Sequence, residues 1–120
     1  MEKQKQPHRR PYYAGYTDHM LNFYISTLKG PQARQEASSV DFRSDVDKQN
    51  WLVCNAVYGR LSASERDLVY AIHSAKQELR HDVVIGIAYQ KQVPVADLWR
   101  TDHQVQYCIA VERGLIAPLR

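Results

Sequence analysis

The chain has 120 residues, of which 44% are hydrophobic, and this length fits one domain with a core of modest size. Its formal net charge at pH 7 is +3, and its sequence pI is about 8.9. The first 11 residues carry four basic side chains and one acidic side chain, whereas the other 109 residues carry 12 of each. Outside this segment the charge gives little support to nucleic-acid binding, because non-specific affinity comes mainly from neutralised phosphates.

Membrane segments and export signals are not expected. The longest apolar run covers residues 83–89, and a bilayer-spanning helix needs about 20 residues. The polar N-terminus has no apolar stretch behind it, as a secretory signal would. We therefore expect a cytoplasmic protein without membrane contact.

Residues 1–11 lack hydrophobic periodicity and include two prolines, which predicts a flexible arm. Two interpretations of this arm stay open. It is a solvated tail, or it is a basic arm that contacts phosphates or the minor groove, as arms beside helix-turn-helix domains do. The phosphate contacts would then come from Lys3, Lys5, Arg9 and Arg10. We divide the chain into this arm (1–11), an N-terminal helix with a linker (12–40) and a helical domain (41–120).

The first helix is predicted over residues 12–28, where four of the eight tyrosines lie. Its expected buried stripe is Tyr13, Tyr16, Met20, Phe23 and Thr27, and Tyr12, Leu21 and Tyr24 broaden this face. A tyrosine stripe of this kind favours core packing over base stacking, because no basic residue is interleaved with it. Gly30-Pro31 and the small polar residues up to position 40 then indicate a loop.

Helical periodicity returns over residues 42–60. Three aspartates there, Asp41, Asp45 and Asp47, alternate with basic residues, which favours a solvated face over a cation site. Ser62 and Glu65 have the spacing of a capping box, so the next helix is expected from Ala63 to about residue 75.

Residues 80–115 predict a helix-turn-helix, and they complete an all-α fold of about five helices. Apolar residues recur at helical spacing on both sides of Gln92-Val93-Pro94, which gives each helix one buried stripe. Pro94 cannot donate a backbone hydrogen bond, and it disfavours a helical conformation at Val93. The turn is therefore expected to be about three residues long, as a helix-turn-helix requires.

The second helix of this motif offers a candidate base-reading face. When Leu98 is set at the centre of the buried stripe, Asp102, Val105, Ile109 and Glu112 lie on or near it. The opposite side then carries Ala96, Arg100, His103, Gln104 and Tyr107. Arginine can bond guanine bidentately and glutamine can do so to adenine, while a small residue lets the helix approach the groove floor. The alternative is an ordinary solvated helix face.

Charge near the motif is balanced, so its phosphate contacts need specific donors. Asp97 is better placed to accept from the free amides at the helix N-terminus than to contact a base. Phosphate contacts would come from Arg80, Lys91, Arg100, the arm or a partner.

Catalytic chemistry is not indicated. Phosphate-binding loops, nucleophile elbows, paired carboxylates and metal-ligand spacings do not occur in the sequence, so we predict no enzyme, no cofactor, no metal and no catalytic residue. Asp18-His19 and His81-Asp82 are sequence neighbours, which on a helix point about 100° apart and form no preset dyad. A site assembled from distant residues stays open. Cys54 and Cys108 lack paired spacing and are expected to be buried free thiols.

Several short motifs resemble those of small phage and prophage regulators of the RinA/ArpU type, whose C-terminal half is similar to region 4 of sigma-70-type sigma factors. The resemblance covers about residues 12–116, and its motifs are mostly packing residues: W-L-x-C-x-x-V (51–57), L-S-x-x-E-R-D (61–67), I-A (87–88), L-W (98–99) and E-R-G-L (112–115). The resemblance implies a transcription regulator, with DNA-contact roles for Ala96, Asp97, Arg100, Thr101 and Gln104.

Two functions from different classes follow from these observations. The first is a phage-type regulator that binds double-stranded DNA in the bacterial cytoplasm. The second is a phage accessory protein that binds RNA polymerase or another host protein through the aromatic first helix without reading DNA. A homodimer is a further option, because one motif reads only a short half-site.

Overall fold

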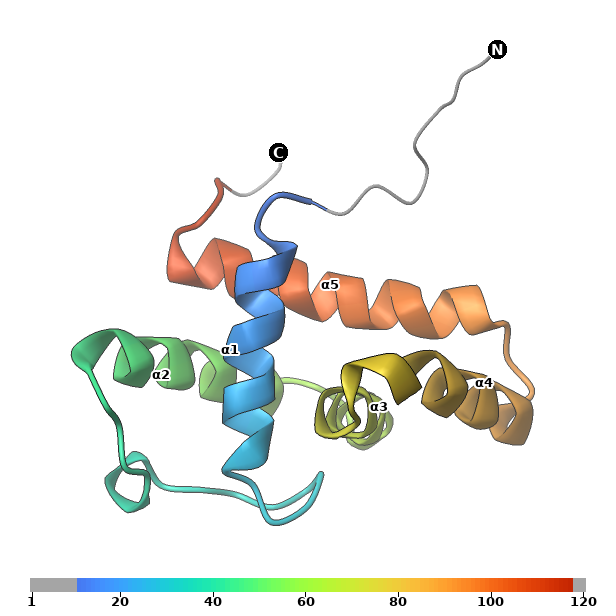
Figure 1. Ribbon diagram of the computed structural model, residues 1–120, viewed down its shortest axis with the longest axis horizontal. Coiled ribbons are helices and arrows are strands. Elements are labelled where there is room, and N and C mark those ends of the chain that lie inside the picture. The colour runs from blue at the N-terminus through green and yellow to red at the C-terminus, as the bar shows by residue number, and fades with distance from the viewer. Residues whose placement is uncertain (1–10, 118–120) are drawn as a thin grey trace.

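The computed structural model describes residues 11–117, and this part of the chain is all-α, as the sequence predicts. Its five α-helices are α1 (Ala14–Ser26), α2 (Asp45–Gly59), α3 (Ala63–Ser74), α4 (Arg80–Lys91) and α5 (Val95–Arg113). Two short 3₁₀ turns, Ala37–Ser39 and Gln77–Leu79, lie in the connections. Figure 1 shows α1 crossing the molecule, with α5 along one side and α2, α3 and α4 along the other.

Side-chain caps set two of the helix starts. Helix α2 begins at Asp45, later than expected from periodicity, because the Ser44 hydroxyl accepts a hydrogen bond from the Asp47 amide at 3.1 Å. The capping box before α3 is confirmed. Ser62 Oγ accepts from the Glu65 amide at 3.1 Å, and Glu65 Oε1 accepts from the Ser62 amide at 2.8 Å.

The connection between α4 and α5 is the predicted short turn, residues 92–94. Gln92 ends α4 in the left-handed conformation with φ 59°, and the Val93 amide donates back to the Ala88 carbonyl at 3.1 Å. Pro94 has φ −63° and ψ 143°, so it stands just before α5 rather than within its first turn. Beyond it, α5 doubles back along the molecule (Figure 1).

The apolar side chains form two clusters. The larger core joins α1, α2 and the C-terminal half of α5, with Trp51, Tyr24 and Ile109 among its buried members. The smaller core joins α3, α4 and the start of α5 through Ile72, Val84 and Leu98. Helices α3 and α5 contribute to both clusters, so they hold the two parts together.

The predicted apolar face of α1 is confirmed in part: Met20, Leu21 and Tyr24 are buried as expected, but Tyr12 and Tyr16 are exposed. The buried positions are Ala14, Thr17, Met20, Leu21, Tyr24 and Ile25. Tyr16 is 40% exposed and Phe23 is half-buried, whereas Tyr24 is 2% exposed and lies against Trp51 with ring centroids 5.3 Å apart. Aromatic rings lie on two adjacent stripes of α1, and helical periodicity alone does not say which of the two faces the core.

The expectation of two buried thiols is confirmed for one cysteine. Cys54 is fully buried in the larger core, but Cys108 is half-buried on α5, and both are free. Burial raises the pKa of the Cys54 thiol to about 12.

Across residues 11–117, the helices are all too short or too polar to cross a lipid bilayer.

Candidate nucleic-acid interface

The outer side of α5 carries the residues predicted to read bases. Leu98, Asp102, Val105 and Ile109 are buried as expected, which fixes the inner side of the helix. Glu112, which was predicted on or near the same stripe, is exposed instead and pairs with Arg60 at 3.2 Å, because the last turn of α5 extends beyond the core. The side chains on the opposite side that are exposed are Ala96, Arg100, His103 and Gln104. We call these four residues the α5 face. Thr101 and Tyr107 are half-buried and lie at its margins.

Local contacts hold the α5 face without covering it. Arg100 Nη1 lies 2.7 Å from Asp97 Oδ1, and the side chains are 72% and 51% exposed. An exposed pair of this kind contributes about 1 kcal/mol at most, so the guanidinium exchanges partners at low cost. The His103 ring stacks on Trp99 with centroids 6.2 Å apart. Arg100 and His103 are therefore positioned by their neighbours yet open to a ligand.

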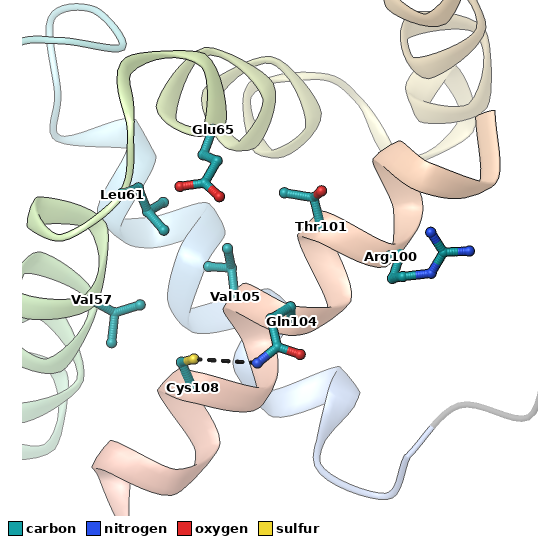
Figure 2. Close-up of a pocket in the computed structure, with 8 residues that line it drawn as sticks. All are labelled: Val57, Leu61, Glu65, Arg100, Thr101, Gln104, Val105 and Cys108. Carbon is teal, nitrogen blue, oxygen red and sulfur yellow. Dashed lines mark hydrogen bonds between the residues drawn. The ribbon is translucent and has the colours of Figure 1, made fainter. Parts of the chain in front are cut away.

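A groove of about 310 Å³ runs beside the α5 face (Figure 2). Val57 and Leu61 line it from the α2–α3 corner, and Val105 and Cys108 line it from α5. The Arg100 guanidinium points away from this groove in Figure 2, whereas the Gln104 amide lies along it, 3.8 Å from Cys108 Sγ. Both side chains line the groove, with the guanidinium of Arg100 directed toward solvent and the amide of Gln104 at the groove edge.

The predicted phosphate-contacting residues do not gather at one place. Lys91 is exposed at the end of α4, with its Nζ 3.1 Å from Ser64 Oγ. Arg80 is 7% exposed, and its guanidinium bonds Asp18 and Asn22 inside the molecule. We therefore leave Arg80 out of the proposed contact surface.

The predicted arm residues Lys3, Lys5, Arg9 and Arg10 lie outside the described residues. The described chain begins at Pro11, and the Tyr12 hydroxyl donates to the Leu115 carbonyl at 3.0 Å. Tyr12 therefore lies near the C-terminal end of α5, far along the helix from Ala96.

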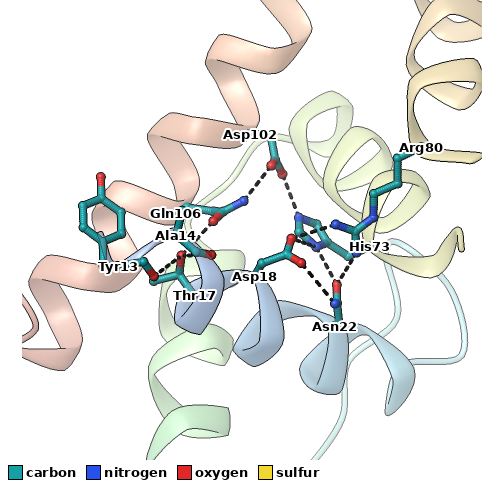
Figure 3. A network of polar contacts seen from close by, with 9 residues as sticks. All are labelled: Tyr13, Ala14, Thr17, Asp18, Asn22, His73, Arg80, Asp102 and Gln106. Carbon is teal, nitrogen blue, oxygen red and sulfur yellow. Dashed lines mark hydrogen bonds and ion pairs between the residues drawn. The ribbon is translucent and has the colours of Figure 1, made fainter. Parts of the chain in front are cut away.

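A buried polar network connects four helices and was not predicted (Figure 3). His73 on α3 lies at its centre, with a fully buried side chain. Its Nε2 is 2.9 Å from Asp102 Oδ1 on α5, and its Nδ1 is 2.8 Å from Asn22 Oδ1 on α1. Arg80 on α4 donates to Asp18 Oδ1 at 2.8 Å and to Asn22 Oδ1 at 2.6 Å.

The network continues along α5 to the start of α1. Gln106 Nε2 donates to Asp102 Oδ2 at 2.9 Å, and the Thr17 hydroxyl donates to Gln106 Oε1 at 2.7 Å. Within residues 11–117, Arg80 Nε is the buried side-chain nitrogen or oxygen that has no hydrogen-bond partner. We call the seven residues Thr17, Asp18, Asn22, His73, Arg80, Asp102 and Gln106 the polar network.

Asp102 is ionised in this environment. Burial alone would raise the pKa of its carboxyl, but the hydrogen bond and charge of His73, the bond from Gln106 and the charge of His103 together lower it below its ordinary value. One sequence signal pointed here. Asp102 falls on the buried stripe of α5, and a buried carboxylate requires a partner. Its partner could not be found from the sequence, because His73 is 29 residues away on another helix.

The described residues 11–117 contain no group of three or more histidine, cysteine, aspartate and glutamate side chains arranged to hold a metal ion. The chain matches no family model, no curated protein and no solved structure among those with which it was compared.

Proposed function

We propose that the protein is a DNA-binding transcription regulator of phage type, and that the α5 face enters the major groove. The single observation that carries this proposal is the α5 face itself: three exposed hydrogen-bonding side chains and a small residue lie on one side of a helix that a short turn joins to α4. The opposite side of the helix is buried, so the face has a fixed orientation.

Each residue of the α5 face has a distinct role in this proposal. Arg100 leaves Asp97 and bonds the N7 and O6 acceptors of guanine, and Gln104 bonds adenine. Ala96, near the helix N-terminus, lets the backbone approach the groove floor. Lys91, at the end of α4, contacts a phosphate and fixes the register.

The test is selection of binding sites from a random duplex library, followed by titration of the selected site over a salt series. The Arg100→Ala variant is expected to lose about 10- to 100-fold in discrimination at one base pair, equivalent to about 1–3 kcal/mol. The matched control is Arg43→Ala, which removes the same charge from a side chain that is 85% exposed and lies outside α5. It is expected to keep the site preference. Absence of any salt-dependent binding would end the DNA proposal.

Asp97 offers a second test, in the opposite direction. Its carboxylate lies beside the α5 face and pairs with Arg100. Asp97→Asn removes a negative charge that would repel phosphates and frees the guanidinium, so DNA affinity is expected to rise several-fold at low salt. An Asp41→Asn variant, altered at an exposed position before α2, controls for net charge. Equal effects of the two variants would mean that DNA does not contact the α5 face.

The second candidate is a protein-binding accessory factor, and one observation favours it. Ile85 and Tyr89 lie one turn apart on α4 and are 44% and 79% exposed. Tyr24, which the sequence suggested as part of an aromatic docking surface, is buried instead and donates to Asn55 at 2.7 Å. Purified bacterial RNA polymerase should then bind the protein but not its Ile85→Ser/Tyr89→Ser variant. Equal binding by both proteins would remove this candidate.

A further inference from the structure

The hydrogen bonds around His73 define the charge of its ring. Nε2 faces a carboxylate oxygen of Asp102, and Nδ1 faces the side-chain oxygen of Asn22. A neutral imidazole donates from one ring nitrogen and accepts at the other, whereas an imidazolium donates from both. Two acceptors on opposite sides of the ring are satisfied at once by the doubly protonated form.

The Asn22 amide has its orientation fixed by its other partners, so its oxygen must face His73. Arg80 Nη2 donates to Asn22 Oδ1 at 2.6 Å, and Asn22 Nδ2 donates to Asp18 Oδ2 at 3.3 Å. Flipping the amide would set its nitrogen against the guanidinium and its oxygen against a carboxylate. Both contacts would be repulsive, so Nδ1 of His73 must carry a proton.

The total charge of the polar network leads to the same conclusion. Asp18 and Asp102 supply two negative charges, and Arg80 supplies one positive charge. A neutral His73 would leave one buried negative charge without compensation, at a high desolvation cost. A protonated His73 balances the network. The groups that face His73 are Asp18 and Asn22 from α1, Arg80 from α4, and Asp102 from α5, with Gln106 and His103 acting on Asp102.

We propose that His73 is a buried imidazolium whose two ring N–H groups donate to Asp102 on α5 and to Asn22 on α1. The position of α5 against α1 and α3 therefore depends on proton binding by His73. Loss of that proton sets a lone pair against an acceptor on one side of the ring. Asp102 lies on the inner side of α5, between Leu98 and Val105, so its release changes how the outer side of the helix is held. Protonation of His73 thus regulates the helix that carries Arg100 and Gln104.

The direct test is the protonation state of the histidine ring nitrogens in the intact protein, measured by NMR from about pH 5 to about pH 9, a range that brackets the ordinary histidine transition. We expect both ring nitrogens of His73 to be protonated at about pH 6. The exposed rings of His19 and His81 serve as internal references. A His73 ring with one unprotonated nitrogen at that pH would overturn the proposal. This measurement needs no DNA, so its outcome is separate from that of the proposed function.

The anchoring role is tested in the same titration. When His73 loses its proton, the side-chain amide of Gln106 and the backbone amides of α5 are expected to shift with the same midpoint as the ring. If the α5 resonances do not change while the His73 ring loses its proton, the proposal that this proton holds α5 in place is refuted.

A double-mutant cycle tests the charge balance independently. His73→Gln and Asp102→Asn are each expected to lower the folding equilibrium constant on the order of a hundredfold, because each leaves a buried charge without its partner. The double variant is neutral at both positions, so its loss should be at least about tenfold smaller than the product of the single losses. The exposed pair Arg60 and Glu112, 60% and 44% exposed, provides the control cycle, with an expected coupling of about fivefold or less. Independent effects of His73→Gln and Asp102→Asn on the folding equilibrium would contradict the proposal. If either variant fails to fold, the NMR measurement on the unmodified chain tests the protonation state of His73 instead.

Discussion

Replacing Asp102 by asparagine tests the electrostatic account of the interior. The residue is 2% exposed, so solvent screening of its interactions is small. Removing one partner of a buried ion pair costs about 3–5 kcal/mol. Asparagine keeps the size of the side chain, and its oxygen still accepts from His73, which favours the lower end of that range. We therefore expect a loss of about 3 kcal/mol at pH 7, which a domain of typical stability survives.

The pH dependence of this loss has a definite sign. The pKa of Asp102 is lower in the folded protein than its ordinary value, so the folded state binds that proton more weakly than the unfolded chain does. The contribution of the carboxylate is therefore complete above the unfolded value of about 3.9 and is lost as the pH falls through the folded value. The difference between the native protein and Asp102→Asn should be fully present at about pH 5 and should shrink below about pH 4.

Urea unfolding followed by tryptophan fluorescence measures the difference, because Trp51 is buried in the larger core. Asp41→Asn, at an exposed position, serves as the control and should change the unfolding free energy by less than about 0.5 kcal/mol. A loss below about 1 kcal/mol at pH 7 would refute the reasoning, and so would a loss that stays constant down to about pH 3.

Three further predictions concern the helix ends and the thiols. Ser62→Ala removes one half of the capping box and should lower the free energy of unfolding by about 1 kcal/mol in the same urea assay. An unchanged free energy of unfolding would mean that the cap does not stabilise α3. Gln92→Gly should raise the free energy of unfolding by a few tenths of a kcal/mol to about 1 kcal/mol, because glycine adopts the left-handed conformation without strain. A lower free energy of unfolding would show that contacts of the Gln92 side chain outweigh its backbone strain. A maleimide should label Cys108 in the folded protein but Cys54 only after unfolding, because burial raises the pKa of the Cys54 thiol to about 12. Equal labelling rates of the two thiols in the folded protein, measured by mass spectrometry, would contradict this.

The sequence predicted the helices better than it predicted their contacts. The capping box at Ser62 and the break at Pro94 are local signals, because the groups that cause them lie within a few residues. The inner side of α5 was found for the same reason, since Leu98, Val105 and Ile109 recur at helical spacing.

Contacts between distant helices had no such signal. Arg80 was predicted to contact phosphates because it is one of the few basic residues of the motif, but its guanidinium bonds Asp18 and Asn22 of α1 inside the molecule. The partner of Asp102 was hidden in the same way, because pairing between α3 and α5 depends on how the helices cross. The helical pattern of one chain determines which side of a helix is apolar, but it does not determine which helices meet.

The division of the interior into two apolar cores has a consequence for how the molecule opens. On α5, Asp102 separates Leu98 of the smaller core from Val105 of the larger one, so a polar layer lies where the two meet. Proteins often open in cooperative units smaller than the whole chain, and the least stable unit is the one with the fewest buried apolar contacts. We therefore expect α4 and the first turn of α5, whose buried apolar residues belong to the smaller core alone, to open as a unit before the rest. Native-state hydrogen exchange would reveal it as a group of amides that share one opening free energy, below that of α1 and α2.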